Sequence, residues 1–173
     1  MNIIQCTFDS HAEQILEILN DAIVSSTALY DYHPRAPESM VPWFESKERS
    51  NFPVIGLEDD GGRLAGFASY GHFRDWPAYK YTVEHSVYVR SDVRARGLGA
   101  TLLKALIQQA QEQDYHVMVG AVDRRNEASV RLHMKLGFIH AGALNEVGYK
   151  FGRWLDLSFS VLTLPTPTSP TDG

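Results

Sequence analysis

The sequence predicts an α/β domain, in which a mixed and mostly antiparallel β-sheet is flanked by helices. Alternating apolar segments, such as Tyr81 to Val89, are typical of strands, and apolar residues three or four positions apart are typical of helices. The resulting order, β-α-α-β-β-β-α-β-α-β-β, places antiparallel strands beside a β-α-β unit. The length of 173 residues suits one domain, so we expect residues 1–164 to form it and residues 165–173, rich in Pro, Thr and Ser, to be a disordered tail.

The N-terminal half is predicted to begin with a strand and an amphipathic helix. Ser10 and Glu13 have the spacing of a capping box, in which two side chains satisfy free N–H groups at a helix start. The turn Asp59-Asp60-Gly61-Gly62 separates two strands of a predicted hairpin. We expect strands at residues 2–7, 53–58, 64–73 and 81–89, and helices at residues 10–26 and 38–49.

The C-terminal half follows the same rules. A buried strand is predicted from the apolar run that begins at His116, and Asn126 is a plausible cap for the helix after it, which Gly137 ends. We expect strands at residues 116–122, 138–144 and 154–164, and helices at residues 98–113 and 127–136.

The composition excludes several classes of function. The net charge of −5, from 16 basic and 21 acidic residues, argues against a nucleic-acid surface. The single cysteine, Cys6, rules out an intrachain disulfide or a cysteine-based zinc site and fits a reducing compartment. The histidines show no metal-ligand spacing, the N-terminus lacks the pattern of a signal peptide, and no apolar run reaches membrane-spanning length. We therefore expect a cytoplasmic protein that binds no metal, membrane or nucleic acid.

The segment from Arg94 to Gly99 is a basic, glycine-bearing turn between a strand and a helix. Gly97 and Gly99 allow the backbone to approach a ligand, while Arg94 and Arg96 supply charge, so the turn is suited to an anion at the helix N-terminus. A helix start that needs glycine for close packing explains the pattern equally well. Neither a Walker motif nor a Gly-x-Gly-x-x-Gly fingerprint is present, which argues against phosphoryl transfer.

This turn, Arg94-Ala95-Arg96-Gly97-Leu98-Gly99, matches the Arg-x-x-Gly-x-Gly signature of the GCN5-related N-acetyltransferase (GNAT) superfamily, whose element order is also the predicted one. Tyr81 to Val89, Asn126 to Phe138 and Gly148 to Asp156 resemble its phosphinothricin acetyltransferase branch. That branch includes acetyltransferases of methionine sulfoximine, methionine sulfone and related amino acids. The resemblance extends over nearly the whole chain, from Ile3 to Leu164.

The resemblance implies acetyl-CoA as the co-substrate and a small amino acid or analogue as the acceptor, whose α-amino group attacks the thioester directly in a ternary complex. It places the pantetheine arm on the backbone of Val87, Tyr88 and Val89, and a further cofactor contact at Asn126. It places the pyrophosphate on Arg94, Ala95, Arg96, Gly97, Leu98, Gly99 and Ala100. Relatives are commonly homodimers, so a homodimer is implied, with the strand of Trp154 as a candidate interface.

Glu84 is the candidate general base. A carboxylate on a central strand is costly to bury unless it is paired or has a raised pKa, and amine acetylation requires the ammonium to lose a proton. A position at the solvated mouth of the strand is the alternative. The resemblance places acceptor contacts at Glu84, His85 and Ser86. Neighbouring strand residues point to opposite faces, so these contacts need a bulge, for which the superfamily is known on this strand.

Five more residues complete the predicted site. By the resemblance, Arg74, Asp75 and Trp76 bind the acceptor from a loop, with Arg74 holding the α-carboxylate, and Tyr30 closes the pocket. His133 stands where many members carry a tyrosine that protonates the coenzyme A thiolate. An imidazole of near-neutral pKa can do the same, although simple packing on its helix is equally compatible.

The predicted function is therefore acetyl-CoA-dependent N-acetylation of an amino acid of the phosphinothricin, methionine sulfoximine or methionine sulfone type. The position of Cys6 disfavours a covalent acyl-enzyme route. The alternatives are acetylation of protein N-termini or polyamines, and a non-catalytic acyl-CoA sensor. A sensor would need neither Glu84 nor Arg74, which favours catalysis.

Overall fold

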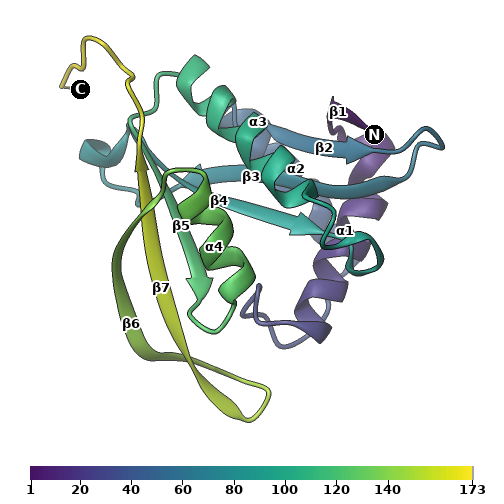
Figure 1. Cartoon of the computed structure of the whole chain (residues 1–173). Helices are drawn as coiled ribbons and strands as arrows, with labels where there is room; N and C mark the ends of the chain where they lie inside the picture. Colours follow the sequence, from purple (N-terminus) through teal and green to yellow (C-terminus); the bar gives the residue numbers. More distant parts are fainter. Residues whose placement is uncertain (173) are drawn as a thin grey trace. The chain divides into compact units, whose positions relative to one another are not determined.

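The computed structural model describes residues 1–172 and confirms the predicted element order (Figure 1). The α-helices are α1 (Phe8–Ser25), α2 (Met40–Arg49), α3 (Leu98–Glu112) and α4 (Glu127–Lys135). The strands are β1 (Asn2–Gln5), β2 (Val54–Glu58), β3 (Leu64–His72), β4 (Thr82–Val89), β5 (Val117–Asp123), β6 (Ile139–Lys150) and β7 (Arg153–Thr163). Short 3-10 helices cover Pro37–Ser39, Pro77–Tyr79 and Ser91–Val93.

The strands form one sheet in the order β1-β2-β3-β4-β5-β7-β6. β4 and β5 pair in parallel, while the pairs β1–β2, β2–β3, β5–β7 and β6–β7 are antiparallel. The predicted fold class, a mixed and mostly antiparallel sheet with flanking helices, is therefore confirmed. The chain divides into two compact units, residues 1–69 with 87–106 and residues 70–86 with 107–173, and strands β3 and β4 each contribute to both.

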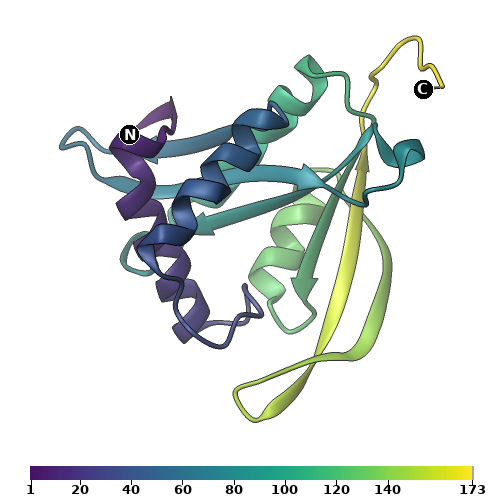
Figure 2. The same ribbon diagram turned by 180° about the vertical axis from the view of Figure 1, so that it is seen from behind.

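The first unit is built around an apolar core between its helices and strands. Figures 1 and 2 show α1 and α2 over one face of β1–β3 and the first turns of α3 over the opposite face. Apolar residues spaced three or four apart on α1 turn toward the strands, which explains the helix, because burial of one face supplies most of its stability. The core contains Cys6, Ile15, Ile18, Leu19, Met40, Val54, Leu64 and Phe67.

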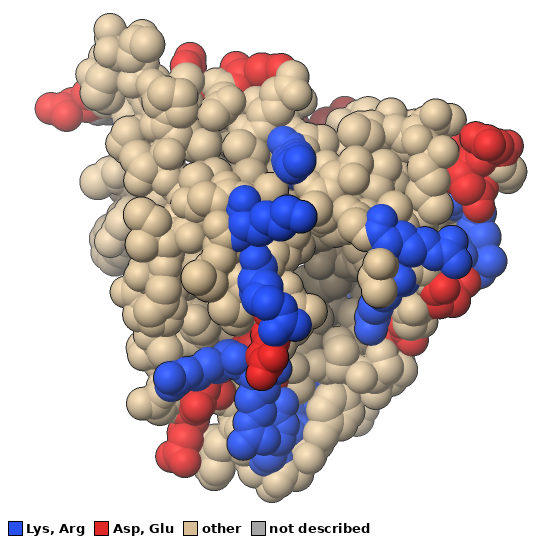
Figure 3. All heavy atoms as spheres, in the orientation of Figure 1, with Lys and Arg blue, Asp and Glu red and all other residues tan. Residues whose placement is uncertain are grey.

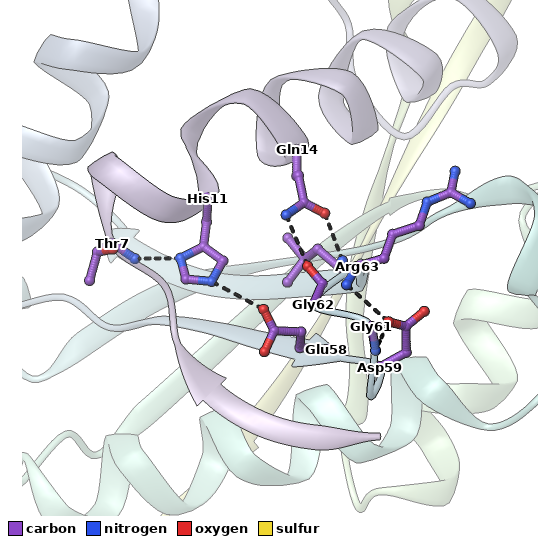
Figure 4. A network of polar contacts seen from close by, with 9 residues as sticks. Thr7, His11, Gln14, Glu58, Asp59, Gly61, Gly62 and Arg63 are labelled. Carbon is purple, nitrogen blue, oxygen red and sulfur yellow. Dashed lines mark hydrogen bonds and ion pairs between the residues drawn. The ribbon is translucent and has the colours of Figure 1, made fainter.

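The start of α1 differs from the prediction. The helix begins at Phe8 with Thr7 at the N-cap, so the expected capping box of Ser10 and Glu13 is wrong. The imidazole of His11 takes the reciprocal role instead, because its Nδ1 accepts a hydrogen bond from the Thr7 N–H at 3.0 Å. The Nε2 of His11 lies 3.6 Å from Oε1 of Glu58 on β2, which ties the helix start to the sheet (Figure 4).

The second unit contains β5, α4 and the long β6–β7 hairpin, with α4 over one face of β5 (Figure 1). The hairpin turns at Phe151 and Gly152, whose positive φ angles of 51° and 72° are those of a type I′ turn. β6 continues to Lys150, beyond the predicted end at Leu144. The prediction ended too early because two register shifts interrupt the alternation of β6 and most of its residues are exposed.

The segment after β7 belongs to the second unit and contacts other parts of it. Thr166 Oγ1 donates to the Tyr115 carbonyl at 2.6 Å, and the Thr171 N–H donates to the Tyr81 hydroxyl at 3.1 Å. The Lys80 ammonium donates to the Asp172 carbonyl at 2.9 Å. These contacts attach the segment near the start of β4; residue 173 of the expected tail lies outside the described residues.

Candidate active site

The strand β4 carries the predicted acceptor and pantetheine residues one after another. Its parallel pairing with β5 ends at Glu84 and Val119, although β4 continues to Val89 and β5 to Asp123. In the first unit, the Tyr88 ring packs 5.4 Å from the ring of Phe67, so the core holds this end of the strand. The second half of β4 is therefore held by its side chains but is not paired with β5. Such a strand can form hydrogen bonds to an extended ligand through its backbone.

The basic turn after β4 has the local geometry expected of an anion site. Ala95 and Gly97 have positive φ angles of 63° and 78°. A Cβ built on Gly97 would meet nothing within 4 Å, so this glycine is required for its backbone conformation and not for packing. Successive turn conformations of this kind, followed by a helix start, present backbone N–H groups to an anion.

The arginines in and before the turn differ in whether an ion pair with a nearby carboxylate holds them. Arg90 forms a bidentate ion pair with Asp92, with nitrogen–oxygen distances of 2.6 and 2.9 Å, and so stabilises the turn itself. Arg94 and Arg96 are exposed, although the Arg94 Nε donates to the Val89 carbonyl at 3.1 Å. Figure 3 shows basic side chains gathered over the segment that leads into α3, as a phosphate-binding turn requires.

Glu84 is partly buried on β4, in the second unit. Burial raises the pKa of its carboxyl group, and the positive charge of Arg74 lowers it by a smaller amount. A carboxylate whose pKa lies above the usual glutamate range is a better proton acceptor, which is the property a general base needs.

Arg74 and its neighbours lie on the exposed loop after β3. The Arg74 guanidinium stacks 4.4 Å from the Phe73 ring centroid and donates to the Phe73 carbonyl at 2.8 Å, which holds the side chain near its own backbone. Asp75 is exposed, and Trp76 is 73% exposed. Arg74 is near enough to Glu84 for its positive charge to lower the pKa of that carboxyl group. The indole of Trp76, by contrast, faces solvent. Tyr30, in the first unit, is 38% exposed.

His85 and His133 meet in the interior of the second unit. Their Nε2 atoms are 3.0 Å apart, and the His133 Nδ1 lies 2.7 Å from the Ser129 carbonyl. Burial lowers the pKa of both imidazoles, that of His85 to about 3, with the charge of His133 as a second cause for His85. Ser86, the next residue on β4, is exposed.

Asn126 caps α4 as predicted, because its Oδ1 accepts from the Ser129 N–H at 3.1 Å. Asp123, which sequence reasoning missed, stabilises the same turn. It is 4% exposed, accepts from the Arg125 N–H at 3.0 Å and pairs with the Arg153 guanidinium at 2.7 Å. Its place at the end of an apolar strand run was the available signal, but its partner lies 30 residues away in the chain.

Within residues 1–172, no group of three or more His, Cys, Asp or Glu side chains is arranged to hold a metal ion. In the same part of the chain, no helix is both long and apolar enough to cross a membrane.

Residues 13–138 match the model of the acetyltransferase (GNAT) family. The chain belongs to this family. It is thus a GNAT N-acetyltransferase with the fold of that family.

A curated relative from Pseudomonas aeruginosa, L-methionine sulfoximine/L-methionine sulfone acetyltransferase, is 46% identical over 90% of this chain and 91% of its own. A solved structure from Acinetobacter baylyi is 57% identical, with a TM-score of 0.98 over 99% of this chain and 96% of that chain. The phosphinothricin acetyltransferase of Sinorhizobium meliloti, solved in complex with acetyl-CoA, is 27% identical, with a TM-score of 0.93 over 99% of this chain and 94% of that chain. GNAT relatives of this fold therefore bind acetyl-CoA.

Proposed function

We propose that the protein transfers the acetyl group of acetyl-CoA to the α-amino group of amino acids of the L-methionine sulfoximine and L-methionine sulfone type. The observation that carries this proposal is the 46% identity, over nine-tenths of both chains, with the Pseudomonas aeruginosa acetyltransferase of these compounds. Phosphinothricin, the acceptor named for a more distant relative, is a further substrate of the same class.

The acceptor is bound and activated by residues of the second unit. Glu84 takes one proton from the ammonium group, directly or through water, and so exposes the nitrogen lone pair. The Arg74 guanidinium binds the α-carboxylate with two parallel hydrogen bonds. Asp75, His85 and Ser86 contribute further contacts. The indole of Trp76, which is 73% exposed, contributes an apolar wall for the acceptor side chain.

Acetyl-CoA is bound by β4 and the turn that follows it. The backbone of Val87, Tyr88 and Val89 hydrogen-bonds the pantetheine arm and stabilises the oxyanion that forms on the thioester carbonyl. The segment from Arg94 to Ala100 binds the pyrophosphate, and Asn126 makes a further contact to the cofactor. Support comes from the positive φ angles, the exposed arginines and the helix start.

The reaction needs no covalent enzyme intermediate. The neutral amine attacks the thioester carbonyl, a C–N bond forms, the C–S bond breaks, and the coenzyme A thiolate takes up a proton. Cys6, the only cysteine, is buried in the core of the first unit, and burial raises the pKa of its thiol to about 12. A thiol in that state is a poor acyl carrier, which supports direct transfer.

We also propose that the protein is a homodimer through the β6–β7 hairpin. Large apolar side chains on this hairpin are about half exposed or more, and an apolar patch of this kind is typical of an interface. A second copy is the simplest partner, because a two-fold axis pairs the patch with itself. The residues are Ile139, Leu144, Val147, Tyr149, Phe151 and Trp154.

Thiol release from acetyl-CoA tests the proposed function. L-methionine sulfoximine, L-methionine sulfone and phosphinothricin should each release coenzyme A and yield the N-acetyl product by mass spectrometry. Faster turnover with a peptide N-terminus or a polyamine would identify one of the alternative acceptors. Binding of acetyl-CoA without thiol release for any acceptor would identify a sensor.

A further inference from the structure

The two buried histidines of the second unit form a hydrogen-bonded pair with a defined geometry. The ring centroids of His85 and His133 are 5.0 Å apart and the interplanar angle is 23°, whereas the two Nε2 atoms are only 3.0 Å apart. The nitrogens therefore lie between the rings and face one another, as in an N–H···N hydrogen bond. One imidazole donates and the other accepts.

The contact between His133 and the Ser129 carbonyl decides which imidazole donates. The His133 Nδ1 lies 2.7 Å from the Ser129 carbonyl, which can only accept, so this Nδ1 carries a proton. In a neutral ring the Nε2 of His133 is then the acceptor. It follows that the Nε2 of His85 donates and that the Nδ1 of His85 keeps a free lone pair.

Packing around the pair preserves this arrangement. His85 is 9% and His133 4% exposed, and the Phe138 ring lies edge-on to both, at 5.6 and 5.0 Å. A Cβ built on Gly120 would lie 2.6 Å from the His133 Nε2 and 2.8 Å from the His85 Nε2. Only glycine at this position leaves room for the contact. Desolvation lowers the pKa of both rings, so the neutral pair is the form present near pH 7.

The Nδ1 of His85 is buried and has no hydrogen-bond partner within the described residues. Buried polar atoms are nearly always paired, so an unpaired one is accounted for by a functional role or by a bound water or ligand. On β4, His85 follows Glu84, the proposed base, and precedes Val87 to Val89, the proposed pantetheine contacts.

We propose that the His85 Nδ1 is a hydrogen-bond acceptor, held in one tautomer by His133, for an N–H group of a bound substrate. This inference rests on the proposed function. Two sources share the chemistry: the amino group of the acceptor and an amide of the pantetheine arm. A neutral hydrogen-bond acceptor such as this imidazole orients an amino group without favouring its ammonium form. A second carboxylate beside Glu84 would favour the ammonium form.

His133 is then a positioning residue and not the acid that protonates the thiolate. Both of its ring nitrogens are occupied, and the neutral ring has its only proton directed to the Ser129 carbonyl. The sequence-based hypothesis of a general acid requires a proton that this arrangement does not offer.

Nitrogen-15 NMR of histidine-labelled protein tests the tautomer directly. In the ligand-free protein, the His85 Nδ1 should show the resonance of an unprotonated ring nitrogen, unchanged between pH 6 and 8. Addition of L-methionine sulfone alone, coenzyme A alone or both should shift this resonance, and the ligand that shifts it identifies the N–H source. A protonated Nδ1, or no shift with any of the three additions, would overturn the inference. These spectra need no turnover, so failure of the proposed function is recognised separately, by the thiol-release assay.

Two variants test whether His133 fixes the tautomer of His85 or only stabilises the fold. His133→Phe removes the acceptor for the His85 Nε2, and Gly120→Ala keeps both imidazoles but forces them apart. Each should give a mixture of His85 tautomers and lower kcat/KM about tenfold, the value of one hydrogen bond. His133→Gln, whose amide oxygen can accept from His85, should restore the single tautomer. His140→Phe, at an exposed histidine of β6, is the matched control. A single His85 tautomer in folded His133→Phe would contradict the role of His133.

Discussion

Replacing Glu84 by glutamine removes the carboxylate that accepts the ammonium proton in the proposed reaction, while it preserves the shape of the side chain on β4. General-base catalysis by a positioned carboxylate contributes about 10²- to 10⁴-fold to the rate. Burial raises the pKa of Glu84 and only Arg74 opposes that shift, so this carboxylate is a stronger base than an exposed glutamate. We therefore expect kcat of Glu84→Gln to fall at least about 100-fold, which corresponds to about 2.7 kcal/mol in the activation barrier.

The pH dependence provides a second readout. In the native enzyme, kcat/KM should fall as the pH drops through a pKa above the ordinary glutamate value, because protonated Glu84 cannot accept a proton. This acid limb should disappear in Glu84→Gln.

The same variant should not lose stability. A carboxyl group whose pKa is higher in the folded state favours folding below its unfolded pKa, and this contribution is lost as the pH rises through the folded pKa. At pH 8 the ionised Glu84 therefore opposes folding, and Glu84→Gln should unfold at an equal or higher urea concentration. Thiol release between pH 5.5 and 9 and urea denaturation check both expectations. An unchanged rate and pH profile in a folded variant would refute the assignment of the base.

Three further predictions concern the acceptor, the cofactor and the assembly. Arg74→Ala should raise KM for L-methionine sulfone about 10- to 100-fold, the value of a charge-assisted hydrogen bond, leave KM for acetyl-CoA unchanged and move the acid limb to higher pH. Gly97→Ala should raise KM for acetyl-CoA about 5- to 30-fold, because a non-glycine residue at a φ of 78° costs about 1–2 kcal/mol. Trp154→Glu should convert the dimer to a monomer in light scattering, because it places a charge among the exposed apolar side chains of the hairpin.

Each of these variants has a matched control. Arg74→Lys keeps the charge, so its acid limb should stay in place; a parallel rise of both Michaelis constants in Arg74→Ala would contradict the carboxylate contact. Gly62→Ala has the same kind of backbone, with a φ of 77° and nothing near its Cβ, and should leave KM for acetyl-CoA unchanged. Trp76→Glu alters an exposed tryptophan away from the hairpin and should remain dimeric. A dimeric Trp154→Glu protein would rule out this interface.

Local patterns predicted the order of elements well, because alternation and helical spacing record which face of each element is buried. Asn126 was predicted as a cap for the same reason: an N-cap needs only residues within its own turn. The start of α1 was placed wrongly because His11, which is not a typical capping residue, accepts the Thr7 N–H. The second half of β6 was missed because an exposed, irregular strand buries no regular face.

The candidate site was predictable where its signal is local, as in the turn from Arg94 to Gly99. The contacts that depend on tertiary structure were not. His85 and His133 are 48 residues apart in the chain, and their contact depends on the absent side chain of Gly120. Sequence alone shows neither the pairing nor the lone pair that it leaves on His85.

Acetyl transfer to a free α-amino acid is tested most directly by comparing kcat/KM for L-methionine sulfone and for its carboxamide in the thiol-release assay. The two compounds differ only in the carboxylate that Arg74 is proposed to bind. We expect kcat/KM for the amide to be about 10- to 100-fold lower than that for the acid with the native enzyme, and we expect this difference to disappear in Arg74→Ala. Equal kcat/KM for the acid and the amide in the native enzyme would contradict it.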